Sequence, residues 1–171
     1  RISINLPIIF EILVDNSIPL KILLRSEDKN DIEKEKLFYQ KILKSKKINF
    51  YEKKGSFDSY LYCDQCELIV TFASTLGFEM YGNGNKVLFF GSDKNLTMNE
   101  NYPFDQCFDK IPEKIKIIKG NKKEILSKLL DLYNLEKREF ENFSKVSRKY
   151  YMSYQERFAH EIIRDDIIAL K

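Results

Sequence analysis

The sequence predicts an α/β protein with a Rossmann-like, doubly wound parallel sheet and a C-terminal helical extension. Short apolar runs alternate with longer amphipathic runs, which is the pattern of consecutive βαβ units. The first of the short runs, residues 20–25, has a nearly continuous apolar face, as in a strand that is covered on both faces. We expect residues 1–135 to form the sheet domain and residues 136–171 to form the C-terminal helices.

The short runs are rich in Ile, Val, Leu and Phe, which favour strands. They cover residues 20–25, 47–51, 67–72, 86–90 and 115–118. The longer runs have apolar residues at helical spacing and are predicted to be helices. They cover residues 6–14, 28–44, 57–65, 74–81, 122–133 and 136–171. The first of these runs can be either a helix or a linker. Asp28 or Asn30 can cap the second helix, Tyr60 and Leu61 lie on the apolar side of the third, and Gly82 to Asn85 can end the fourth.

Composition places the chain among ordinary globular proteins. Of its 171 residues, 43% are hydrophobic and 32% charged, and the formal net charge is +3. This mild positive charge suits a small anionic ligand but is too weak to indicate nucleic acid, so we expect no nucleic-acid partner. No apolar run approaches the roughly 18 residues of a membrane-spanning helix. The chain opens on Arg1 rather than Met, so we expect it to belong to a longer polypeptide.

The cysteines and the single histidine do not predict a metal or redox site. Three cysteines are present, two of them as a Cys63-x-x-Cys66 pair, and an odd number favours a reducing compartment. A zinc site would have to bring this pair together with Cys107 and His160 from distant segments. A redox Cys-x-x-Cys motif follows a strand, whereas this pair is expected where a helix runs into a strand.

The most informative segment is residues 66–79, where an apolar strand runs directly into a polar helix start. In parallel sheets, ligands bind outside the carboxyl ends of the strands, and a helix N-terminus there suits a phosphate. Ser74 and Thr75 add hydroxyl donors, and Gly77 leaves room for a ligand or for close packing. Glu79 can accept hydrogen bonds from ribose hydroxyls. The alternative is that Ser74 only caps the helix and that Glu79 is a solvated helix residue.

The run from Leu68 to Gly91, with its strand, Ser-Thr-x-Gly-x-Glu helix start, turn and strand, resembles the C-terminal, donor-binding lobe of GT-B glycosyltransferases. It is most similar to transferases of bacterial capsule and lipopolysaccharide synthesis. The order of elements from Leu20 to Tyr133 is compatible with the same lobe. The resemblance implies a nucleotide-sugar-dependent transferase of surface polysaccharide biosynthesis, of which this chain is a fragment that is inactive alone.

The resemblance assigns a nucleotide-sugar-binding role to several residues. Ser74 and Thr75 would bind the donor phosphates, and Glu79 would approach the ribose. Arg25, at the end of the first strand, would stabilise the departing nucleotide phosphate, unless it is only a surface cation. Tyr51 would stack on the base or pack in the core.

The run Gly91-Ser92-Asp93 would place Ser92 beside the sugar. Two positions differ from the family pattern: the first strand is followed by Arg25 to Asp28 rather than by His-Pro, and Phe72 stands where some members carry a second Glu.

The resemblance also implies which groups lie outside this chain. The catalytic base would come from the N-terminal, acceptor-binding lobe, which would be the partner of this chain, so we assign no catalytic residue here. No Asp-x-Asp motif occurs, which favours a metal-independent transfer without a cofactor. A cytoplasmic location is expected, at the inner face of the membrane if the basic and aromatic run Arg148 to Tyr154 touches anionic lipid. That run could instead pack on its own chain or on the other lobe.

Two other functions remain open on the sequence. One is a related GT-B-like enzyme, either a nucleotide-sugar epimerase or a CDP-alcohol phosphotransferase, whose further acids or histidines would lie elsewhere. The other is a non-catalytic, flavodoxin-like interaction domain. A phosphoacceptor receiver domain is disfavoured because the third strand ends in Thr71-Phe72-Ala73, where such a domain needs an Asp.

Overall fold

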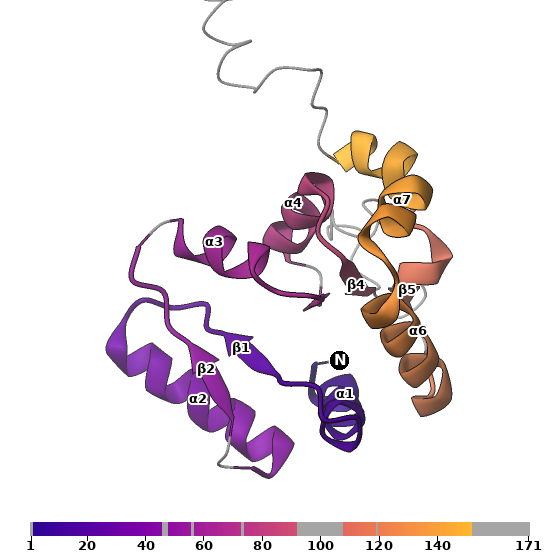
Figure 1. Ribbon diagram of the computed structural model, residues 1–171. Helices are drawn as coiled ribbons and strands as arrows, with labels where there is room; N and C mark the ends of the chain where they lie inside the picture. The colour runs from indigo at the N-terminus through magenta and orange to yellow at the C-terminus, as the bar shows by residue number, and fades with distance from the viewer. Residues whose placement is uncertain are drawn as a thin grey trace, which may run out of the picture.

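A computed structural model describes residues 2–45, 48–55, 57–72, 74–91, 108–118 and 120–151. These residues form a mixed α/β structure in which short strands alternate with helices (Figure 1). The strands are β1 (Lys21–Leu23), β2 (Asn49–Tyr51), β3 (Ile69–Thr71), β4 (Val87–Phe90) and β5 (Lys116–Ile117). The helices are α1 (Ile2–Asp15), α2 (Lys29–Leu43), α3 (Asp58–Asp64), α4 (Thr75–Asn83), α6 (Lys122–Asn134) and α7 (Lys137–Tyr151), with a 3-10 turn, η2 (Glu113–Ile115).

All the strand pairs are parallel, as predicted. β1 pairs with β2, with Ile22 opposite Phe50. β4 pairs with β3 on one side and with β5 on the other, with Val70 opposite Leu88. Each strand lies within the run that predicts it. The helices form two groups by contact: α1 packs on α2 and α6, whereas α3 and α7 pack on α4.

The described residues form two hydrophobic core clusters. The main cluster surrounds β4, whose four residues are all buried, as the continuous apolar run predicts. The smaller cluster contains Leu24, at the end of β1, and Ile32 of α2. Leu20 and Phe72 pack against both clusters. They therefore connect the β1–β2 pair with the three-stranded sheet.

Helix α1 begins earlier than the sequence predicts. It starts at Ile2 and includes Pro7, although a proline inside a helix removes one backbone hydrogen bond. Leu6 and Ile9, on either side of this proline, are buried, and Ile12 is buried one turn later. Burial of this apolar face stabilises the helix across the proline.

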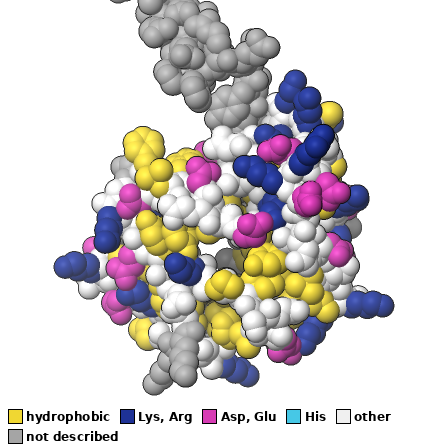
Figure 2. Space-filling view, viewed as in Figure 1, with side chains coloured by type: hydrophobic (Ala, Val, Ile, Leu, Met, Phe, Trp, Pro, Cys, Tyr) yellow, Lys and Arg dark blue, Asp and Glu magenta, His cyan; other side chains and the backbone are white. Residues whose placement is uncertain are grey.

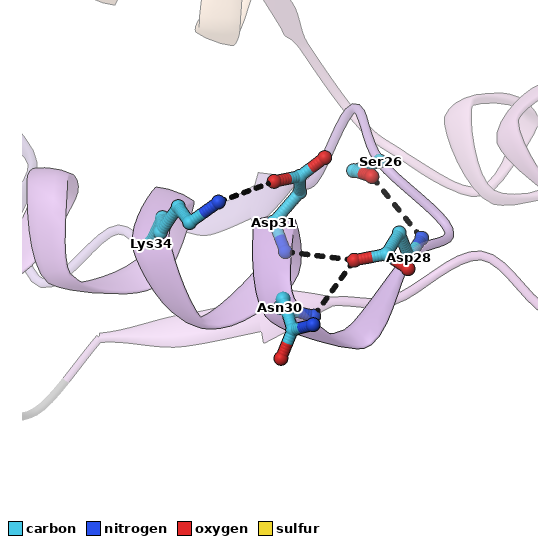
Figure 3. A network of polar contacts seen from close by, with 5 residues as sticks. All are labelled: Ser26, Asp28, Asn30, Asp31 and Lys34. Carbon is cyan, nitrogen blue, oxygen red and sulfur yellow. Dashed lines mark hydrogen bonds and ion pairs between the residues drawn. The ribbon is translucent and has the colours of Figure 1, made fainter.

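Helix α2 shows how local sequence fixes an element boundary (Figure 3). Oδ1 of Asp28 accepts hydrogen bonds from the backbone N–H groups of Asn30, at 2.9 Å, and Asp31, at 3.2 Å. Of the two residues that could cap this helix, Asp28 is therefore the one that does. The hydroxyl of Ser26 accepts a bond from the backbone N–H of Asp28, and Lys34 forms an ion pair with Asp31. Such a cap stabilises a helix by about 1 kcal/mol.

Helix α7 packs against the C-terminal end of α4. Phe140 of α7 is fully buried in the main cluster. The hydroxyl groups of Ser147 and Tyr81 share a short hydrogen bond. Nε of Arg148 donates to the backbone carbonyl of Gly82, at 3.4 Å, where a positive charge also complements the helix dipole. Gly84 ends α4 with a φ of 102°, within the turn that the sequence predicts.

Candidate functional site

Helix α4 begins directly after β3, as the sequence predicts, and its first residues are exposed. Ser74 is the N-cap residue, with an extended backbone, and Thr75 is the first helical residue. The side chain of Ser74 makes no capping hydrogen bond in the described structure. Its backbone N–H donates to Oγ1 of Thr71, at 3.3 Å. The hydroxyl of Ser74 is therefore not used as a cap within the described residues.

Gly77 serves close packing of α4 on β3. A Cβ atom at this position would lie 2.7 Å from both Oγ1 and Cγ2 of Thr71. This is closer than real Cβ contacts allow, so only glycine fits without a shift. Of the two roles that the sequence offers for Gly77, the structure supports packing, which holds the start of α4 against the end of β3.

Glu79 has a partner that the sequence does not predict. Oε2 of Glu79 accepts a hydrogen bond from the hydroxyl of Tyr60 on α3, with 2.5 Å between the oxygens. The pKa of Tyr60 is raised, first by this hydrogen bond and then by burial. Glu79 is half-buried, so it is not the fully solvated helix residue of the alternative interpretation. Nothing in the spacing of two residues 19 positions apart indicates this contact.

Arg25 lies at the carboxyl end of β1. The backbone N–H of Leu24 donates to the carbonyl of Tyr51, at 3.0 Å, so the ends of β1 and β2 lie side by side. The backbone N–H of Arg25 donates to Oε2 of Glu35, at 2.9 Å. Arg25 is exposed. Burial and the charge of Glu35 raise the pKa of Tyr39, and the positive charge of Arg25 opposes this rise. Arg25 thus follows β1 at its carboxyl end, the position along the chain that the sequence predicts.

Tyr51 stacks on another tyrosine. Its ring lies 3.9 Å from the ring of Tyr62 on α3, centroid to centroid, at an interplanar angle of 15°. Nζ of Lys21 lies 5.5 Å from the centroid of the Tyr62 ring. Burial raises the pKa of Tyr62 to about 12. One face of the Tyr51 ring is therefore covered by its own chain, which supports the packing role that the sequence left open.

Phe72, which follows β3, connects the β1–β2 pair with the sheet of β3, β4 and β5. Its ring stacks on Phe90, at the end of β4, with 5.0 Å between centroids. Phe72 also packs against the smaller cluster, to which Leu24 at the end of β1 belongs. Figure 2 shows a hollow in the same view as Figure 1, with hydrophobic side chains on either side of it. An aromatic side chain in place of a second Glu thus has a packing role at this position.

The other candidate residues are only partly covered by the structure. Ser92, Cys107 and His160 lie outside the described residues. Cys63 lies in α3 and Cys66 between α3 and β3, as predicted, and burial raises the pKa of both thiols. Within the described residues, no group of three His, Cys, Asp or Glu side chains could hold a metal ion. Among the helices described, none combines the length and the apolar character that crossing a bilayer requires.

Comparison with known proteins gives one informative match. A family model described as "putative O-antigen biosynthesis protein" matches residues 3–161, which is most of the chain. No curated protein and no solved structure gives a significant match. The family match supports the part of the sequence prediction that concerns surface-carbohydrate biosynthesis. By its sequence, the chain belongs to this family of O-antigen biosynthesis proteins.

Proposed function

We propose that the chain is the donor-binding lobe of a nucleotide-sugar-dependent glycosyltransferase that acts in bacterial surface polysaccharide synthesis. Membership of an O-antigen biosynthesis family supports the pathway. The observation that carries the proposal is the exposed start of α4, where the hydroxyl of Ser74 makes no capping bond. This start lies at the carboxyl end of β3, as Arg25 lies at the carboxyl end of β1.

The proposed site is the point where the strand order reverses. If β1 lies beside β3, the strands form one doubly wound sheet in the order β2-β1-β3-β4-β5, and ligands bind such sheets between β1 and β3. The packing of Leu20 and Phe72 against both core clusters supports this arrangement. Right-handed crossovers would place α2 on one face and α3 and α4 on the other. The separate contacts of α2 with α1, and of α3 with α4, agree with that placement.

The site has groups for each part of a nucleotide sugar. The free N–H groups and positive dipole end of α4, with the hydroxyls of Ser74 and Thr75, would bind the phosphates. The guanidinium of Arg25 would stabilise the charge on the departing nucleotide, which is how a metal-independent transfer lowers its barrier. Glu79, held by Tyr60, would accept hydrogen bonds from the ribose.

The remaining parts of the donor would meet residues at neighbouring strand ends. The base would lie near Tyr51, on the side that Tyr62 does not cover, and the sugar near Ser92. The catalytic base and the acceptor site belong to the N-terminal lobe in this proposal.

Nucleotide titration tests the proposal. We expect one of UDP, CMP, GDP and ADP to bind the chain in calorimetry, with NMR shifts at Arg25, Thr75 and Glu79. Arg25→Ala should weaken binding by about 1–3 kcal/mol, the range for a charge-assisted hydrogen bond that is partly desolvated. Arg138→Ala, an exposed arginine on α7, is the matched control and should bind as the unchanged chain does.

Two results would contradict this function. If none of the four nucleotides binds, the non-catalytic interaction domain becomes the better explanation. If one binds but Arg25→Ala and Arg138→Ala both leave the affinity unchanged, the nucleotide occupies another site.

A further inference from the structure

Helix α7 carries a second apolar stripe, on the side that does not face the core. Its inward side buries Phe140 and Ser144. Val146 and Tyr150, four residues apart and so on one side of the helix, are 84% and 60% exposed. We call these two residues the outer stripe of α7. Packing of α7 on α4 leaves this stripe exposed, so it is not needed to hold the helix in place.

Lysines border the outer stripe on both sides. Lys110 and Lys114, from the segment 108–118, approach from one side. Their Nζ atoms each lie 5.8 Å from a ring centroid, Lys110 from Tyr150 and Lys114 from Phe143, the half-buried residue one turn before Val146. Lys145 and Lys149 lie along the other side, because each precedes a stripe residue by one position on the helix, and both are exposed.

The two segments that carry this stripe and its flanking lysines have an excess of positive charge. Residues 108–118 and 137–151 together contain eight Lys and Arg residues against four Asp and Glu residues. The whole chain contains 29 against 26, so the rest of the chain carries no excess of positive charge. Figure 2 shows several Lys and Arg side chains over the position of α7, with Asp and Glu side chains among them. Exposed apolar side chains between lysines are the composition of a surface that lies in a membrane interface.

We propose that the outer stripe of α7 and its flanking lysines bind an anionic lipid surface. Val146 and Tyr150 would enter the boundary between headgroups and acyl chains, and a tyrosine suits that boundary because its ring is apolar and its hydroxyl polar. The four lysines would reach outward to lipid phosphates while their aliphatic stems cover the stripe. The bound orientation follows: α7 lies parallel to the membrane, with α4 on its far side. This contact is independent of the proposed nucleotide site.

Vesicle flotation with the full chain tests the proposal. The probe is vesicles of phosphatidylcholine and phosphatidylglycerol in equal parts, compared with vesicles of phosphatidylcholine alone. We expect binding to the mixed vesicles, no binding to the neutral ones, and release by added salt. The double variant Lys145→Ala/Lys149→Ala should bind about 25-fold more weakly, because each lysine near an anionic surface contributes about fivefold.

Matched variants distinguish this surface from a general attraction of charges. Lys29→Ala/Lys41→Ala, two exposed lysines on α2, removes the same charge and should bind as the unchanged chain does. Val146→Ser/Tyr150→Ser keeps every charge and should also lose binding, and the exposure of both residues leaves the fold intact, as a melting curve can verify. The proposal would be overturned if the α2 and α7 lysine variants lost vesicle affinity to the same extent. It would also be overturned if the unchanged chain did not bind the mixed vesicles. The latter result would point to an acidic protein surface as the partner.

Discussion

The hydroxyl of Tyr60 on α3 donates a hydrogen bond to the carboxylate of Glu79 on α4, with 2.5 Å between the oxygens. This contact joins two helices that follow different strands, and it fixes one oxygen of the acidic residue that the nucleotide proposal needs. Glu79 lies one turn after the start of α4. The orientation of its carboxylate at the candidate site is therefore set from α3, outside its own helix.

Removing this hydroxyl should lower stability. Tyr60→Phe should cost about 1 kcal/mol of unfolding free energy at pH 7, the usual net value of one such hydrogen bond. Because the folded-state pKa of Tyr60 is raised above 10, the contribution is complete below pH 10 and is lost as the pH rises through the folded-state pKa. Urea unfolding of the unchanged chain and of Tyr60→Phe, across pH 7 to 11, measures both effects. Equal stability of the two proteins at pH 7 would show that the contact contributes nothing.

Gly77 should not tolerate a methyl group. Gly77→Ala places its Cβ 2.7 Å from the side chain of Thr71, and we expect a loss of about 1–3 kcal/mol, the usual cost of overpacking. The loss occurs although alanine favours helices by about 1 kcal/mol over glycine. Gly55→Ala is the control, because a Cβ there would lie at an ordinary contact distance of 3.6 Å from Oδ1 of Asp58. The melting temperatures of both variants test this prediction. A Gly77→Ala protein that melts at a higher temperature than the unchanged chain would contradict the packing argument.

Lys86 should stabilise the C-terminal end of α6. This buried lysine forms an ion pair with Glu67 and donates to the carbonyls of Tyr133, at 2.9 Å, and Leu135, at 3.1 Å. Lys86→Met keeps the aliphatic stem but removes the ammonium group, so we expect a loss of about 2 kcal/mol from carbonyls left without their donor. Lys123→Met, at the exposed start of α6, should change stability little. Denaturant unfolding compares the two, and equal midpoints would refute a special role for Lys86.

Cys63 should react slowly with alkylating reagents. Burial raises the pKa of its thiol to about 11, so little thiolate is present at pH 8. We expect iodoacetamide to modify Cys63 much faster in urea than in the folded chain, as measured by mass spectrometry of the peptide that contains it. The raised pKa stabilises the fold below pH 9, and this contribution is lost as the pH rises through 11. Rapid modification of the folded chain at pH 8 would reopen a redox role for the Cys63-x-x-Cys66 pair.

The sequence predicts the strands well because each lies in a short run that is rich in apolar residues. The observed strands are shorter than these runs, since residues such as Leu24 and Phe72 are apolar for packing and lie beyond the paired segments. The helix boundaries follow from local signals such as Asp28 and Gly84. The prediction for Leu61 is wrong. The sequence analysis places Leu61 with Tyr60 on the apolar side of α3, but Leu61 is 61% exposed.

The site is less predictable than the fold. The local sequence pattern correctly predicts that Ser74 and Thr75 lie at the start of α4 and that Arg25 follows β1. It does not reveal that Glu79 binds Tyr60 or that Tyr51 stacks on Tyr62, because these contacts depend on how α3 lies against the sheet. The spacing of residues along one helix or strand carries no information about such packing.

The attachment of α7 to α4 also affects how the chain folds during synthesis. Phe140 is fully buried in the main cluster, and the hydroxyl of Ser147 bonds to that of Tyr81, which precedes it by 66 residues. A ribosome makes the chain from its N-terminus, so the core around β4 keeps an unfilled space until the last described helix has left the exit tunnel. Closing so long a loop is slow compared with forming the βαβ units before it. The rings of Phe78 and Tyr81 contact aromatic rings of α7. We therefore expect the nascent protein to expose these two rings until α7 binds, and to depend on that final step for protection from aggregation.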